Sequence, residues 1–142
     1  MRAVLDASAA INIVTGGNFS DMIVEGLDMC NFVYAPTLYY SEVGNGLLHS
    51  VRAGVLSYSK ALTCYEDALS FVTSFVDIKT LSLSTFREAY RLNHSICDIY
   101  YFELAKQTGA HLVTLDQKLI RLAQEHELRY IQFEDVSNSF FS

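Results

Sequence analysis

Basic residues are scarce in this chain, and their scarcity excludes one common way of binding nucleic acid. The 142 residues contain 10 Lys and Arg against 16 Asp and Glu, which gives a formal net charge of −6. A protein that grips nucleic acid over a broad face usually carries an excess of basic residues. If this protein acts on nucleic acid, local features of its surface must provide the contacts.

Cysteine and proline are also rare. Cys30, Cys64 and Cys97 are odd in number and widely spaced, so they fit neither a disulfide framework nor a zinc site. We interpret them as buried free thiols in a reducing compartment. The chain has one proline and seven glycines, which leaves no stretch that resembles a linker. Since a domain averages roughly 150 residues, we expect residues 1–142 to form a single domain.

Long apolar runs are missing as well. No run approaches the roughly 20 residues that a membrane-spanning helix needs. Asp6 interrupts the N-terminal region before an apolar signal segment can form. We therefore expect a soluble, cytoplasmic protein that does not associate with a membrane.

Segments typical of strands alternate with segments typical of helices. Strands are predicted at 2–5, 32–35, 76–81, 111–115 and 129–133, the second of them closed by Pro36. Helices are predicted at 7–14, 19–27, 38–52, 57–75, 84–92, 98–107 and 117–126. This alternation indicates an α/β fold with a parallel sheet. In such folds, functional sites lie beyond the C-terminal ends of the strands.

Four acidic residues stand out because each is the only charged residue in a long stretch of chain. They are Asp6, Glu42, Asp98 and Asp116, and their uncharged surroundings span 18, 23, 11 and 11 residues respectively. Surface acids normally sit among other charges. A lone acid in a largely apolar segment tends to lie at a boundary or inside, where it must be paired, hydrogen-bonded or bound to metal.

The predicted positions of these acids agree with a shared metal site. Asp6 ends the first strand and Asp116 follows the strand at 111–115, so both fall at the C-terminal edge of the sheet. Asp98 opens a helix, and Glu42 lies within one. Such hard oxygen ligands favour Mg²⁺ or Mn²⁺ over zinc.

Simpler interpretations exist for the individual residues. Asp6, Asp98 and Asp116 each precede a predicted helix, so each could be an N-cap, and Glu42 could bond Asn45 on its own helix face. Three smaller polar residues lie near the acids in sequence: Ser8, Asn45 and Thr114. Each of these could orient a metal ligand or simply bond local backbone. The four histidines form no ligand pair.

The ordered set of motifs around these acids resembles the PIN-domain ribonucleases and, within them, the VapC toxins of toxin–antitoxin pairs. The motifs are Val4-Leu5-Asp6-Ala7-Ser8, Ser41-Glu42-Val43-Gly44-Asn45, the run 98–105 that begins with Asp98, and Leu112-Val113-Thr114-Leu115-Asp116. The resemblance covers nearly the whole chain. It implies a parallel sheet of four or five strands flanked by helices. It also implies that the four acids bind one or two Mg²⁺ or Mn²⁺ ions and that the protein cleaves single-stranded or loop RNA.

The resemblance further implies a homodimer that is inhibited by a small antitoxin. We expect the apolar, tyrosine-rich stretch 32–48 to contribute to a groove for an antitoxin helix, with an Arg reaching towards the carboxylates. The alternative is that Tyr39, Tyr40 and Leu47 only pack internally.

Two other functions are compatible with the sequence. One is a metal-dependent phosphohydrolase acting on another substrate. The dehalogenase-like phosphatases place a second acid two residues after the first, and that position is Ser8 here. The other is a non-catalytic PIN-like binding module in which the acids serve only as helix caps.

Overall fold

The computed structural model describes residues 1–133, and its centre is a parallel sheet of four strands. The strands are β1 (Arg2–Leu5), β2 (Phe32–Pro36), β3 (Ser74–Val76) and β4 (His111–Val113), in the spatial order β3-β2-β1-β4. In the register, Ala3 pairs with Val33 on one side and with His111 on the other. The predicted α/β fold with a parallel sheet is confirmed.

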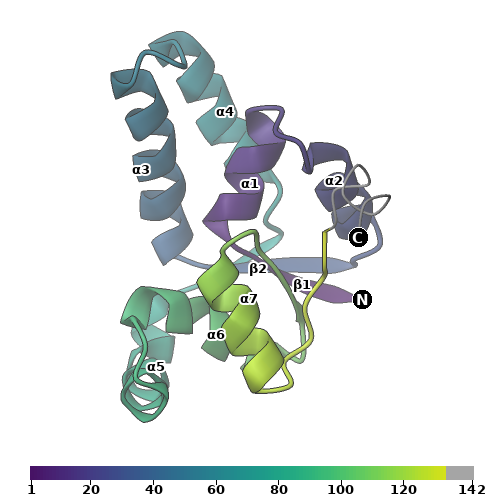
Figure 1. The fold of residues 1–142 in the computed structure, drawn as a ribbon, viewed down its shortest axis with the longest axis vertical. Coiled ribbons are helices and arrows are strands. Elements are labelled where there is room, and N and C mark those ends of the chain that lie inside the picture. The colour runs from purple at the N-terminus through teal and green to yellow at the C-terminus, as the bar shows by residue number, and fades with distance from the viewer. Residues whose placement is uncertain (134–142) are drawn as a thin grey trace, which may run out of the picture.

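Helices cover both faces of this sheet, and Figure 1 shows them on its two sides. They are α1 (Ala7–Val14), α2 (Ser20–Asp28), α3 (Leu38–Arg52), α4 (Tyr58–Ser70), α5 (Ile78–Leu92), α6 (Ile96–Thr108) and α7 (Gln117–Glu125). Helices α1–α4 lie on one side, where α3 and α4 project as a hairpin, and α5–α7 lie on the other. No helix in residues 1–133 is both long and apolar enough to cross a membrane.

The sequence of β1 explains why the sheet sits at the centre. Side chains alternate between the two faces of a strand, and here both faces are apolar. Ala3 and Leu5 pack into the core on the side of α1–α4, whereas Val4 packs into the core on the side of α5–α7. All three side chains are fully buried. A parallel strand that is covered on both faces reads as this kind of continuous apolar run.

The segment between residues 57 and 81 differs from the prediction. The helix expected to run to Phe75 ends at Ser70, and the strand expected at 76–81 lies instead at Ser74–Val76. Backbone pairing with β2 explains the difference, because the Thr73 N–H donates to the Val33 carbonyl at 2.8 Å and β3 continues that pairing. Asp77 then caps α5 by accepting from the Lys79 N–H at 2.9 Å, so the helix begins six residues earlier than expected.

Among the residues described after α7, a single bridge connects the chain to the sheet. The strand predicted at 129–133 is reduced to the parallel pairing of Leu112 with Tyr130. The Leu112 N–H donates to the Arg129 carbonyl at 2.9 Å, and the Ile131 N–H donates to the Leu112 carbonyl at 3.0 Å. The expectation of three buried thiols was also wrong in part, since only Cys64 is buried and Cys97 is exposed.

Candidate active site

The four lone carboxylates lie close enough to influence one another. Asp6 directly follows β1, and Asp116 lies three residues after the neighbouring strand β4. Glu42 comes from α3 and Asp98 from the first turn of α6. Charge repulsion acts between every pair of the four side chains, and it contributes to raised pKa values at Asp6, Glu42 and Asp98. The structure therefore brings together acids that are far apart in the sequence.

Asp6 is the most deeply buried of the four, and two hydroxyl groups hold it. Burial raises its pKa, and the hydrogen bonds oppose that rise. Ser8 Oγ donates to Asp6 Oδ2 at 2.5 Å, and Thr114 Oγ1 donates to the same oxygen at 2.7 Å. Asp6 occupies the N-cap position of α1 but makes no side-chain capping bond. Its carboxylate is thus directed into the site rather than onto the helix end.

Ser8 and Thr114 also accept hydrogen bonds from backbone, which is local only for Thr114. The Leu115 N–H donates to Ser8 Oγ at 3.0 Å, and the Asp116 N–H donates to Thr114 Oγ1 at 3.0 Å. Each hydroxyl therefore fixes Asp6 while tying it to the segment that carries Asp116. The Asn45 side chain, in contrast, is exposed and forms no hydrogen bond to an acid or to local backbone among the described residues.

Glu42 has an unusual environment for a helix-face carboxylate. Burial, together with repulsion from the other three acids, raises its pKa from 4.5 to about 7. Its Oε1 is buried and has no hydrogen-bond partner among the described residues, and the same is true of the Tyr101 hydroxyl. These two groups lie close enough for Tyr101 to lower the pKa of Glu42, but they do not reach hydrogen-bond geometry. A buried carboxylate oxygen without a donor is suited to an external ligand.

Asp98 and Asp116 have different surroundings from each other. Burial and repulsion from Asp116 raise the pKa of Asp98, and the nearby His94 and Lys118 lower it. His94 Nδ1 lies 3.7 Å from Asp98 Oδ2. Asp98 lies inside α6, whose N-cap position is Ser95, so it is not an N-cap. Asp116 does cap α7, because its Oδ1 accepts from the Lys118 N–H at 2.9 Å.

Tyr101 and His94 were not identified from the sequence. Tyr101 follows Asp98 by three residues, a spacing that places both on one helix face, but nothing in the local pattern shows which tyrosine of the Tyr100–Tyr101 pair turns inward. His94 lies in the loop between α5 and α6, where only the tertiary packing brings it to Asp98.

The donor set suits a hard divalent cation. Within residues 1–133, no three acidic, His or Cys side chains are arranged as a ready-made metal cage. Mg²⁺ does not require one, because it usually keeps several waters and binds one or two carboxylates together with substrate phosphate. An all-carboxylate set that includes an unpartnered buried oxygen fits that mode of binding.

Comparisons with known proteins agree with this fold. The crystal structure of PAE2754 from Pyrobaculum aerophilum is similar to this fold, with a TM-score of 0.66 at 21% sequence identity over 85% of this chain and 78% of that one. None of the curated proteins matches the sequence. The family model for the PIN domain matches residues 3–125, which contain the four acids, the seven described helices and the four described strands except Arg2 of β1. The chain therefore belongs to the PIN domain family.

Proposed function

We propose that this protein is a metal-dependent endoribonuclease whose active site contains Asp6, Glu42, Asp98 and Asp116. The PIN domain is generally a nuclease fold, and its members typically use divalent metal ions. The observation that carries the proposal is the convergence of these four carboxylates, from the ends of β1 and β4 and from α3 and α6, to positions where they lie close enough to repel one another. Such crowding costs free energy unless a cation balances it.

In this proposal each side chain has a separate task. Asp6 and Asp98 would hold the cation directly, and Asp116 would hold a second ion or its waters. A bound divalent ion would neutralise the phosphate and lower the pKa of the attacking water. Glu42, whose buried Oε1 has no partner among the described residues, would bind the same ion directly or through water and would help to accept the proton of the attacking water.

The two alternative functions receive less support. For a dehalogenase-like phosphatase, the position two residues after Asp6 would carry a second acid, whereas Ser8 there donates its hydroxyl to Asp6. For a binding module, the acids would serve as helix caps. Only Asp116 makes a side-chain capping bond, and neither Asp6 nor Asp98 does so.

Cleavage of single-stranded RNA tests the proposal. The purified protein should cut such RNA with Mg²⁺ or Mn²⁺ and should stop when a chelator is added. Asp6→Asn and Asp98→Asn should remove activity while circular dichroism shows an intact fold. Asp67→Asn, at an exposed position on α4, is the matched control and should keep full activity. Cleavage that survives chelation or both site variants would overturn the assignment.

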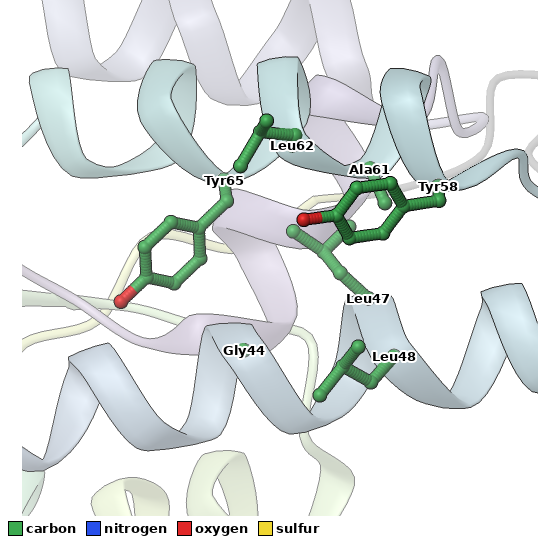
Figure 2. Close-up of a pocket in the computed structure, with 7 residues that line it drawn as sticks. All are labelled: Gly44, Leu47, Leu48, Tyr58, Ala61, Leu62 and Tyr65. Carbon is green, nitrogen blue, oxygen red and sulfur yellow. The ribbon is translucent and has the colours of Figure 1, made fainter.

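We further propose that the nuclease is the toxin of a toxin–antitoxin pair, with an antitoxin helix bound between α3 and α4. A groove of about 250 Å³ lies there, and Figure 2 shows its apolar lining. The lining residues are Gly44, Leu47, Leu48, Tyr58, Ala61, Leu62 and Tyr65. Its only polar side-chain atoms are tyrosine hydroxyls, so it fits the apolar face of an amphipathic helix.

This groove differs from the one expected over residues 32–48. Tyr39 is fully buried and donates its hydroxyl to the Ala68 carbonyl at 2.6 Å, and Leu47 is nearly buried. Tyr40 stacks on Phe75 with ring centroids 4.5 Å apart. At 100° per residue, Glu42 points away from the α3 face that carries Leu47 and Leu48. An antitoxin Arg would therefore reach the carboxylates from a segment that follows the helix.

Co-expression with the product of the adjacent small gene tests this partner. The two proteins should co-purify, and Leu62→Glu, within the groove, should separate them. Val24→Glu introduces the same charge at an exposed apolar position on α2 and should leave the complex intact. Equal loss of binding in the two variants, or no complex with wild type, would count against a helix in this groove.

We also propose a homodimer that packs through α5. Leu83, Phe86 and Tyr90 are exposed on one face of this helix, at 61%, 66% and 88% of their surfaces. A second copy, related by a two-fold axis, would place the same stripe against this one. Light scattering should give the dimer mass for wild type and the monomer mass for Phe86→Glu. A monomeric wild-type protein would contradict the proposal.

A further inference from the structure

A basic hollow lies directly beside the carboxylates. Its volume is about 250 Å³, and its lining consists of His94, Lys118, Arg121, Leu122 and Glu125. All but His94 come from α7, the helix that Asp116 caps, and His94 comes from the loop before α6. The hollow therefore adjoins two of the four acids. Its lining has a positive balance, since Glu125 opposes two permanent cations.

Contacts link the hollow to the site. His94 Nδ1 lies 3.7 Å from Asp98 Oδ2, and the charge of Lys118 acts on the same carboxylate. The Lys118 N–H also donates to Asp116 Oδ1. A polymeric substrate held by the acids would thus reach this hollow without crossing another element.

The two cations in the hollow form no salt bridge with any of the described acids. Within residues 1–133, neither Lys118 nor Arg121 forms an ion pair, although Glu125 follows Arg121 by one helical turn. Arg91 and Lys106, in contrast, both pair with Glu88. Unpaired cations next to an acidic centre offer a site for an anion that also approaches that centre, and a guanidinium matches phosphate oxygens with two parallel hydrogen bonds.

We propose that this hollow binds a backbone phosphate of the RNA strand next to the phosphate that is cleaved. The inference rests on the proposed nuclease function and adds the residues that hold the substrate. It accounts for RNA binding by a chain with a net charge of −6, because the positive charge is placed at one point beside the acids. No aromatic side chain that could stack a base lines the hollow except the ring of His94. The contact should therefore be largely independent of sequence.

Equilibrium binding tests the proposal without depending on cleavage. The probe is a short, unstructured, fluorescein-labelled RNA, titrated in chelator with the Asp98→Asn protein and followed by anisotropy. In that background, Lys118→Gln with Arg121→Gln removes both cations. Each phosphate contact to a single strand contributes about 0.7 to the slope of log affinity against log salt. Because the hollow holds one phosphate, the slope should become shallower by about 0.7, and affinity at 0.1 M NaCl should fall about 5-fold.

The control carries the same change of charge elsewhere. Arg52→Gln with Lys60→Gln alters two exposed cations near the α3–α4 turn, at the opposite end of the molecule from α7. It should leave the slope unchanged. Equal effects of the two double variants would mean general attraction only and would overturn the subsite. The subsite would also be overturned if the Asp98→Asn protein did not bind the RNA with a dissociation constant of about 10⁻⁴ to 10⁻⁶ M, the range typical of non-specific contacts.

Cleavage kinetics provide a second measurement that separates the two proposals. With Mg²⁺, the Lys118→Gln, Arg121→Gln protein should show a raised KM for a longer RNA. Its KM for a dinucleotide, which has only the scissile phosphate, should equal that of wild type. A changed KM for both substrates would refute the subsite but leave the nuclease standing. No cleavage by wild type would refute the nuclease, and the anisotropy result would still decide the subsite. If the variant loses only antitoxin binding, the hollow is a protein contact instead.

Discussion

Replacing Glu42 with Gln should stabilise the metal-free protein at alkaline pH. In the folded protein, burial and three neighbouring acids hold the Glu42 pKa at about 7, whereas an unfolded chain has the ordinary value of 4.5. Between those two values the folded state binds more protons. Its stability therefore falls as pH rises from 4.5 to 7, and the full cost is present above pH 7. Gln keeps the shape of the side chain but never ionises.

The size of the gain follows from this difference in pKa. A rise from 4.5 to about 7 corresponds to about 3 kcal/mol when it is fully expressed in stability. Since Glu42 is only partly buried, solvent screening reduces the figure, and we expect a gain of about 1 to 2 kcal/mol near pH 8. Near pH 5 the wild-type carboxyl keeps its proton in the folded state, so most of the gain should disappear.

Urea unfolding in chelator, at both pH values, measures this difference. Glu66→Gln is the matched control, because Glu66 is an exposed residue in the middle of α4. It should change stability by less than about 0.5 kcal/mol at either pH. Two results would contradict this prediction: a Glu42→Gln protein that is no more stable than wild type near pH 8, or a gain in its free energy of unfolding that is as large near pH 5 as near pH 8. Either result would mean that Glu42 is solvated rather than crowded.

Three further predictions concern the same site. Thr114→Val removes a donor to buried Asp6 and should lower the free energy of unfolding in urea by about 1.5 to 3 kcal/mol. Thr85→Val is the control, because it removes a buried hydroxyl that has no partner among the described residues. It should leave the stability unchanged or raise it. Similar losses of stability in the two variants would mean that the hydrogen bond from Thr114 to Asp6 does not stabilise the fold. Mn²⁺ at about 100 times its dissociation constant should stabilise wild type by about 2.7 kcal/mol in thermal melts and Asp98→Asn by much less; equal gains would mean that Asp98 is not a ligand. Tyr101→Phe should raise the pKa of Glu42, because the hydroxyl lowers it, and carbon NMR of the carboxyl group should show a later titration; an unchanged titration would mean that the two groups do not interact.

Elements whose pattern is local could be predicted from the sequence. The strand 2–5 and the helices 7–14 and 38–52 have the predicted bounds. In each, the apolar run or the helical spacing of apolar residues persists along the whole segment, and no other secondary structure fits the same pattern. The segment 57–81 could not be placed, since its apolar residues recur at a helical spacing and only pairing with Val33 converts residues 74–76 into a strand. The segment 129–133 failed for the related reason that only Tyr130 pairs with the sheet edge.

The acids of the candidate site could be found because each is the only charged residue in a long stretch of sequence. Their neighbours could not. Ser8 and Thr114 were identified as candidates since they lie within two residues of Asp6 and Asp116, but their joint hold on one carboxylate oxygen depends on the pairing of β1 with β4. Asn45 was selected on its helix spacing alone, and that spacing turns it to solvent.

The origin of the four acids in both layers of the fold connects the site with stability. Glu42 lies on α3, whose Val43 packs into the core on one face of the sheet, and Asp98 lies on α6, whose Ile99 packs into the core on the other face. Asp6 follows β1, which contributes to both cores. The four carboxylates can therefore meet only when both layers have packed, and the packing must overcome their repulsion. The proposed cation would relieve the repulsion and bind only the complete fold, so its binding energy would add to the stability of the whole domain rather than of one element. Such coupling would offset the cost of placing the buried Asp6 and three half-buried acids beside two apolar cores.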